Sequence, residues 1–125
     1  MNENDLSKKI IGAAIEVHRY LGPGLLESAY SRCLARELCI QGIGYNSEIA
    51  IPLEYKGEKI EAGYRLDFLI DGRVIVELKS VEQLLPIHDA QLLSYLRLTD
   101  KKLGLLINFN VAVLKNGIKR IVNNL

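Results

Sequence analysis

The sequence has no tryptophan, one methionine, three prolines and two cysteines in 125 residues. Two cysteines are too few for a disulfide framework, and Cys33 and Cys39 lie six residues apart in a predicted helix, so they face different sides of it. We therefore expect two buried thiols in a reducing compartment, with the cytoplasm as the predicted location. No apolar run approaches the roughly 20 residues that a membrane span needs, and the polar start MNENDLSKK has no signal-peptide core.

An excess of charge of one sign is also missing, because 16 Lys and Arg balance 15 Asp and Glu to a net charge of +1. No global field draws such a chain to nucleic acid, although a local basic cleft remains compatible with this balance. Hydrophobic residues make up 49% and charged residues 25%, as in ordinary globular proteins. The length predicts a single domain over residues 1–125 with a core that needs no disulfide or metal for stability.

The spacing of apolar residues and turn signals predicts the order of the helices and strands. Helices are predicted over residues 6–20, 25–41 and 86–100, and strands within residues 48–80, at 103–110 and in the C-terminal segment. Asn4 or Asp5 is the expected cap of the first helix. Residues 48–80 predict three strands joined at YKGE and IDGR, and Pro52 indicates that the first strand is irregular or at an edge.

The resulting order, ααβββαβ(β), predicts an α/β (α+β) fold with helices flanking a mixed sheet. Because a helix separates the strand at 103–110 from the preceding three, we expect that strand to run parallel to one of them.

The stretch VIVELKS, residues 74–80, places two charges in an apolar strand. Glu77 and Lys79 share one face because side chains alternate along a strand, and an unpaired buried carboxylate costs several kcal/mol. The preceding strand carries Asp67. If Ile70 pairs with Arg73 across the Asp71-Gly72 turn, Asp67 lies one step from Glu77. Two carboxylates and a backbone carbonyl suit Mg²⁺ or Mn²⁺, and the nearby lysine suits charge stabilisation at a phosphate.

Polar residues on the predicted helices lie at spacings that place them on one face. Gln91 and Tyr95 are four residues apart, and Glu27 and Tyr30 are three apart at the start of the second helix. Each has an ordinary alternative: a glutamate favours a helix N-terminus, and tyrosines often lie at the edge of a core. The charges of residues 77 and 79 could likewise lie on a solvated strand face.

Taken together, these motifs resemble a known family. GLLESAY, residues 24–30, matches the signature for which the GxxExxY proteins are named. LDFLIDGRVIVELKS resembles the core of the PD-(D/E)XK nuclease superfamily, which has the restriction-endonuclease-like fold, and QLLSY resembles the Gln-x-x-x-Tyr element of one of its branches. The resemblance covers about residues 10–120, with the departure that Leu66 stands where the motif has proline.

The resemblance implies a site for Mg²⁺ or Mn²⁺ and a role for each motif residue. The implied metal ligands are Asp67, Glu77, the carbonyl of Leu78 and, directly or through water, Glu27. Lys79 would be the catalytic lysine, and Gln91 and Tyr95 would support it or touch the phosphate.

The expected function is therefore that of a metal-dependent phosphodiesterase, a nuclease that cleaves DNA or RNA, with DNA preferred as the expected partner. A homodimer or another protein is expected to position so small an enzyme on its substrate. One alternative is a catalytically silent module that binds nucleic acid or protein and keeps the nuclease fold. Another is a purely structural role, in which Glu77 and Lys79 pair with each other or with Asp67 and Arg65.

Overall fold

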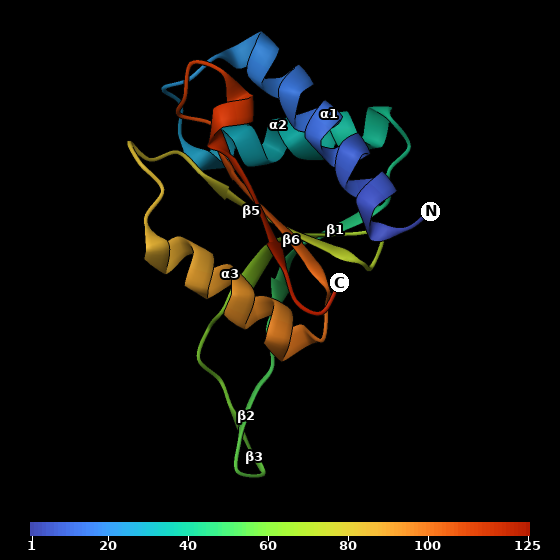
Figure 1. Cartoon of the computed structure of the whole chain (residues 1–125), viewed down its shortest axis with the longest axis vertical. Helices are drawn as coiled ribbons and strands as arrows, with labels where there is room; N and C mark the ends of the chain where they lie inside the picture. Colours follow the sequence, from blue (N-terminus) through green and yellow to red (C-terminus); the bar gives the residue numbers. More distant parts are fainter.

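The computed structural model describes residues 1–125 and has helices on both faces of a five-stranded sheet (Figure 1). In chain order the elements are α1 Glu3–Leu21, α2 Glu27–Ile40, β1 Tyr45–Ala50, β2 Leu53–Tyr55, β3 Glu58–Ile60, β4 Arg65–Ile70, β5 Val74–Lys79, α3 Pro86–Thr99, β6 Leu103–Asn108, the 3-10 helix η1 Leu114–Gly117 and β7 Ile118–Val122. The predicted α/β fold is confirmed and is consistent with a restriction-endonuclease-like arrangement. None of the helices has the length and apolar character that crossing a membrane requires.

The main sheet has the strand order β1-β4-β5-β6-β7. β1, β4 and β5 form an antiparallel meander, and β6 runs parallel to β5 after the α3 crossover, as the sequence predicted. β7 closes the other edge antiparallel to β6. β5 is therefore the middle strand, where neighbours on both sides restrict its position.

A separate hairpin interrupts the meander between β1 and β4. Strands β2 and β3 pair only with each other, across the predicted turn at Lys56 and Gly57. Pro52 has no N–H to continue a strand ladder, so the chain leaves the main sheet after β1. Figure 1 shows this hairpin projecting beyond α3, away from the body of the protein. The sequence pattern predicted three strands within residues 48–80, so it did not distinguish β2 and β3 from the longer strands β1 and β4 that flank them.

Two details of the helices differ from the sequence prediction. α1 begins one turn early because Asn2, rather than Asn4 or Asp5, caps it; the Asp5 N–H donates to Asn2 Oδ1 at 2.8 Å. The two cysteines are free thiols, but only Cys33 is half-buried, whereas Cys39 is exposed. Leu38 points into the core, and the next residue along a helix points about 100° away from it.

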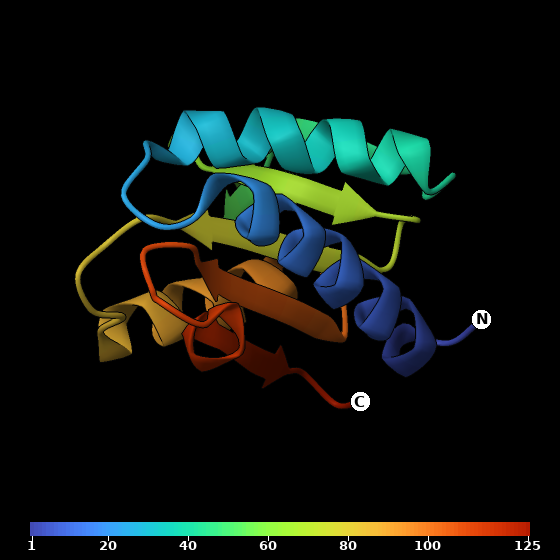
Figure 2. The same ribbon diagram turned by 90° about the horizontal axis from the view of Figure 1, so that it is seen from above.

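The sheet separates two apolar clusters, one on each of its faces. Figure 2 shows α1 and α2 in front of the sheet and α3 behind it. α1 and α2 pack on one face, together with Val76 and Leu78 of β5, whereas α3 packs on the other face with Ile75. Because side chains alternate along β5, Glu77 and Lys79 follow Ile75 to the α3 face. Glu77 and Lys79 therefore lie at the C-terminal end of β5, on the same face of the sheet as the apolar cluster under α3.

We predict that close packing of α3 on β6 makes Gly104 intolerant of a side chain. A Cβ at this position would lie 2.9 Å from Leu92 Cδ1 and Cγ, and Leu92 is only 1% exposed. Gly104→Ala should lower the free energy of unfolding by about 1–3 kcal/mol in urea denaturation. Gly12→Ala, where an added Cβ meets nothing within 4 Å, is the control and should keep or raise stability. Equal stability of Gly104→Ala and wild type would contradict this packing.

Candidate active site

The acidic residues of β4 and β5 meet where the ladder between these strands ends. The strands pair Ile70 with Val74 and Phe68 with Val76, so the predicted pairing of Ile70 with Arg73 is wrong by one residue. The reason lies in the turn, where the Arg73 N–H donates to the Ile70 carbonyl at 3.0 Å and Arg73 is used inside the loop. The observed register, continued by one residue, places Asp67 opposite Glu77.

Beyond the Phe68–Val76 pair, the carboxylates of Asp67 and Glu77 accept the hydrogen bonds that backbone carbonyls accept in a continuous ladder. The Asp67 N–H donates to Glu77 Oε2 at 2.7 Å, and the Leu78 N–H donates to Asp67 Oδ2 at 2.8 Å. Neither carboxylate takes part in an ion pair within the chain. These crossed bonds hold two carboxyl groups against each other in the gap between the strands.

This arrangement raises the pKa of both carboxyl groups. Glu77 is only 6% exposed, and burial together with the charge of Asp67 raises its pKa to about 8. Burial also raises the pKa of Asp67, although the Leu78 N–H and the charge of Lys79 act in the opposite direction. The pair therefore lacks a full counter-charge within the protein.

Lys79 is half-buried at the end of β5, and its charge favours the ionised form of both carboxyl groups. It forms no ion pair with either, because the three ion pairs of the structure all join other residues. The purely structural alternative, in which Lys79 or Arg65 pairs with these acids, is therefore not what the fold contains. The ammonium group remains available to a further anion.

Gln91 and Tyr95, the two predicted site residues of α3, differ in their surroundings. Tyr95 is 7% exposed, and its pKa is raised by burial and by the charges of Glu77, Tyr64 and Asp67, which places it beside the acidic pair. Gln91 is exposed and lines a groove of about 420 Å³ with Tyr95 and Tyr64. The structure therefore brings Tyr95 to the carboxylates and leaves Gln91 one helical turn away.

The residues of the GLLESAY stretch fix the start of α2. The buried Tyr30 hydroxyl donates to the Gly22 carbonyl at 2.6 Å and accepts from the Leu25 N–H at 3.1 Å, while its ring stacks on Phe109 at 4.4 Å. Gly24 has a φ of 98°, a conformation that side chains disfavour. The turn held in this way places Glu27 at the first residue of α2.

The end of β5 is tied to the same turn and to β6. Ser80 Oγ donates to the Leu25 carbonyl at 2.5 Å, so the turn before α2 is joined directly to the residue that follows β5. On the other side Asn108, 2% exposed, accepts from the Val81 N–H and donates to the Val81 carbonyl. Sequence reasoning missed Asn108; the signal was a polar residue at the end of an otherwise apolar strand.

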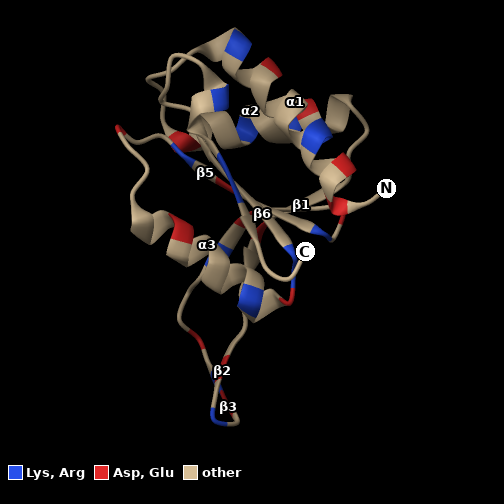
Figure 3. Ribbon diagram, viewed as in Figure 1, with Lys and Arg blue, Asp and Glu red and all other residues tan.

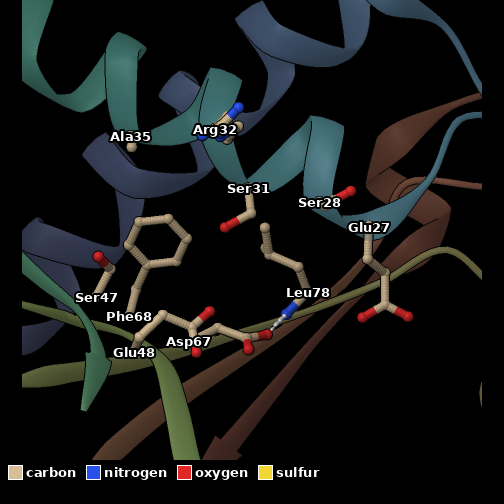
Figure 4. Close-up of a pocket in the computed structure, with 10 residues that line it drawn as sticks. All are labelled: Glu27, Ser28, Ser31, Arg32, Ala35, Ser47, Glu48, Asp67, Phe68 and Leu78. Atoms are coloured by element: carbon tan, nitrogen blue, oxygen red, sulfur yellow. Dashed lines mark hydrogen bonds between the residues drawn. The ribbon is translucent and has the colours of Figure 1, made fainter.

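A pocket of about 460 Å³ opens between α2 and the sheet, and Figure 4 shows its lining. Asp67 and Leu78 form its floor, Glu27 stands at one end, and Ser31 and Arg32 reach in from α2. Glu48 of β1, which sequence reasoning did not single out, lies beside Asp67. An exposed glutamate in an edge strand carries no signal in a single sequence.

The carboxylates do not form a preassembled cage, since no group of three or more His, Cys, Asp or Glu side chains lies close enough together to hold a metal ion. Glu27 as a ligand therefore remains a prediction. The donor chemistry of Asp67 and Glu77 nevertheless fits Mg²⁺, which proteins commonly bind through one or two carboxylates while water and substrate phosphate complete the octahedron. The Leu78 carbonyl points to the same gap as its N–H and adds a third hard oxygen.

Comparison with known proteins agrees with this geometry. The family model of the PD-(D/E)XK nuclease superfamily matches residues 4–121, and the chain belongs to this superfamily. Its members typically use divalent metals. No curated protein and no solved structure matches the chain significantly.

We predict that the acidic pair makes the metal-free protein less stable as pH rises. An unfolded glutamate releases its proton near pH 4.5, whereas folded Glu77 keeps its proton up to about pH 8. Between these values unfolding releases a proton, so the free energy of unfolding should fall by up to about 1.4 kcal/mol per pH unit. Urea denaturation in chelator across this range measures the slope, and Glu77→Gln should flatten it. Identical slopes in both proteins would contradict the raised pKa.

Proposed function

We propose that the protein is a metal-dependent phosphodiesterase that cleaves nucleic acid, with DNA as its preferred substrate over RNA. The observation that carries this proposal is the crossed pair of Asp67 and Glu77 at the split between β4 and β5. Membership of the PD-(D/E)XK nuclease superfamily supports the same reaction class. Burial of two acids without a neutralising ion pair is costly, and a bound divalent cation offsets that cost.

Asp67, Glu77 and the Leu78 carbonyl would hold Mg²⁺ or Mn²⁺, and Glu27 would add a ligand directly or through water. When bound, such a cation lowers the pKa of a coordinated water, and the cation itself neutralises negative charge on the phosphate. Glu77 binds a cation only after it gives up its own proton, so cation binding and loss of this proton are linked.

The remaining residues act on the substrate. Lys79 would donate to a non-bridging phosphoryl oxygen, where negative charge increases in the transition state, and its freedom from ion pairs leaves all its donors available for that task. Tyr95, whose pKa the charges of Glu77 and Asp67 help to raise, would orient the attacking water through its hydroxyl. Gln91, one turn away, would contact the phosphate or support the lysine.

The protein has no broad positively charged face that could bind nucleic acid. Figure 3 shows Lys and Arg distributed over the helices and the sheet, interspersed with Asp and Glu, and the net charge is +1. Affinity for a phosphate backbone would therefore come from the site itself, with help from a second copy or a partner protein. Cleavage of both strands of a duplex would need two such sites, which a two-fold dimer supplies.

The alternative, a silent module that keeps the nuclease fold, is favoured only by the absence of three converging acidic ligands. It differs from the proposal in one observable respect. A silent module would bind nucleic acid or protein in the presence of Mg²⁺ or Mn²⁺ and leave every phosphodiester bond intact.

We predict that end-labelled DNA oligonucleotides are cut by the purified protein with Mg²⁺ or Mn²⁺ and remain intact with chelator. Single-stranded and duplex DNA and RNA should be tested side by side. Lys79→Ala and Asp67→Asn should each lower the cleavage rate by about 100-fold or more, because Lys79 would stabilise charge on the reacting phosphate and Asp67 would hold the cation that does the same. Lys115→Ala, an exposed lysine on η1, is the matched control and should cut at the wild-type rate. Absence of cleavage of every substrate would contradict the proposal.

A further inference from the structure

A groove of about 420 Å³ lies between α3 and the base of the β2–β3 hairpin. Leu53 and Tyr64 line it from the hairpin side, and Ile87 is one of the α3 residues that line it from the other. None of the lining side chains is an acid, a lysine, an arginine or a histidine, whereas Gln91 and Ser94 add uncharged polar groups. A ligand that matches this lining is largely apolar, carries no charge and has a polar edge.

Two aromatic rings from separate elements meet at this groove. Tyr64, just before β4, is 43% exposed, and Tyr95 of α3 is 7% exposed. Their ring centroids are 6.1 Å apart, with an angle of 55° between the ring planes. Because the rings are tilted and do not stack on each other, the exposed part of the Tyr64 ring is free to contact a ligand.

The groove is continuous with the candidate active site. Glu77 and Lys79 lie on the α3 face of the sheet, and Tyr95 packs on the same face in the apolar cluster that includes Ile75. Tyr95 also lines the groove, and the charge of Glu77 helps to raise its pKa. A nucleotide whose phosphate lies at Lys79 would therefore have the groove next to it.

Charge favours a nucleobase over a phosphate group as the ligand of this groove. A phosphate gains nothing from an uncharged lining, whereas a base is a flat, uncharged ring system with hydrogen-bonding groups along its edge. Leu53 and Tyr64 also line a second hollow of about 410 Å³, which contains Lys59 and Arg65 and a single acid, Glu61. The positive groups that suit a neighbouring phosphate are thus close to the groove and outside it.

The ring of Tyr64 can be reached only by a base that is not already stacked in a duplex. In double-stranded nucleic acid both faces of each base are covered by its neighbours, so an enzyme must unstack a base before an aromatic side chain can lie on it. In single strands the bases are accessible, and stacking on aromatic side chains adds affinity that does not depend on positive charge. This source of affinity suits a chain with a net charge of +1.

We propose that Tyr64 stacks on an unpaired nucleobase beside the phosphate that is cut, so that single-stranded nucleic acid is the preferred substrate; this inference rests on the proposed function. The base occupies the groove between the hairpin and α3, with Gln91 and Ser94 at its polar edge. Sequence preference is weak, because every base presents a flat face for stacking.

Fluorescence anisotropy of a labelled single-stranded oligothymidylate tests this assignment by binding alone. The full chain carries Lys79→Ala to suppress cleavage and is titrated in Mg²⁺. Adding Tyr64→Ala should raise the dissociation constant about 10-fold or more, whereas Tyr64→Phe keeps the ring and should leave it unchanged. Tyr55→Ala removes another exposed tyrosine of the hairpin, one that does not line the groove, and should also leave it unchanged.

An unchanged dissociation constant for Tyr64→Ala would overturn the proposal, and this is the result expected if the groove instead binds an apolar segment of a partner protein. Equal losses in Tyr64→Phe and Tyr64→Ala would overturn it too, because the hydroxyl rather than the ring would then be the contact. Thermal melting followed by circular dichroism establishes that the variants are folded. Tyr64→Leu, which keeps an apolar side chain without a ring, takes the place of Tyr64→Ala if the latter is unfolded.

A strand of deoxyribose phosphates without bases separates stacking from a structural role of Tyr64. The proteins with Tyr64 and with Tyr64→Ala should bind this strand equally, and they should also bind duplex DNA equally. A loss of the same size on the base-free strand would show that Tyr64 acts on the backbone or on the fold, and would overturn the proposal.

Cleavage assays on the protein with Lys79 distinguish failure of this inference from failure of the proposed function. If substrates are cut and Tyr64→Ala binds and cuts single strands as Tyr55→Ala does, the nuclease stands and the stacking role falls. If Tyr64→Ala weakens binding of single strands and no substrate is cut, the stacking role stands in a module without nuclease activity.

Discussion

The exchange of carboxylate-to-amide hydrogen bonds between Asp67 and Glu77 is the interaction on which the architecture of the site depends. Ordinary strand pairing would satisfy these backbone groups with carbonyls and would leave no acid at the centre of the sheet. Here side-chain oxygens accept from the N–H groups of Asp67 and Leu78, so the strands can separate while both amides stay paired. The acids thus have a structural task in addition to the chemical one proposed for them, and neither can be replaced by an apolar residue without leaving a backbone N–H unpaired.

The surrounding elements limit how the ends of these strands can move. The Tyr30 hydroxyl and Ser80 tie the start of α2 to the end of β5, and Asn108 ties the loop after β5 to β6. None of these bonds involves a charged group, and each has a backbone atom at one end. A site that binds and releases a highly charged ligand keeps its geometry best when its supports do not themselves depend on charge.

Much of this could be read from the sequence, and the failures have identifiable causes. Apolar periodicity predicted the helices and the parallel strand, and the charges within residues 74–79 pointed to the acidic pair. The register was wrong by one residue because turn length, rather than hydrophobic pattern, sets the pairing in a hairpin. The conformation of Glu48 was inaccessible, because a positive φ at an exposed residue depends on the neighbouring strand and leaves no mark on composition. The chemical roles of all the predicted site residues remain predictions: Glu27, Asp67, Glu77, Leu78, Lys79, Gln91 and Tyr95.

The projecting β2–β3 hairpin is attached only loosely to the main sheet, so its sequence can change with little effect on the rest of the fold. A single backbone bond, from the Ile51 N–H to the Tyr64 carbonyl at 2.9 Å, closes its base, and its strands share no ladder with the main sheet. Lengthening, shortening or replacing this segment leaves the pairing of the acid-bearing strands unchanged. Tyr64 lies at the base of the hairpin, and its ring centroid is 6.1 Å from that of Tyr95. A change in the hairpin would therefore lie next to the candidate site. The hairpin is thus a position where the chain can vary in length and sequence while the strands that carry Asp67 and Glu77 keep their pairing.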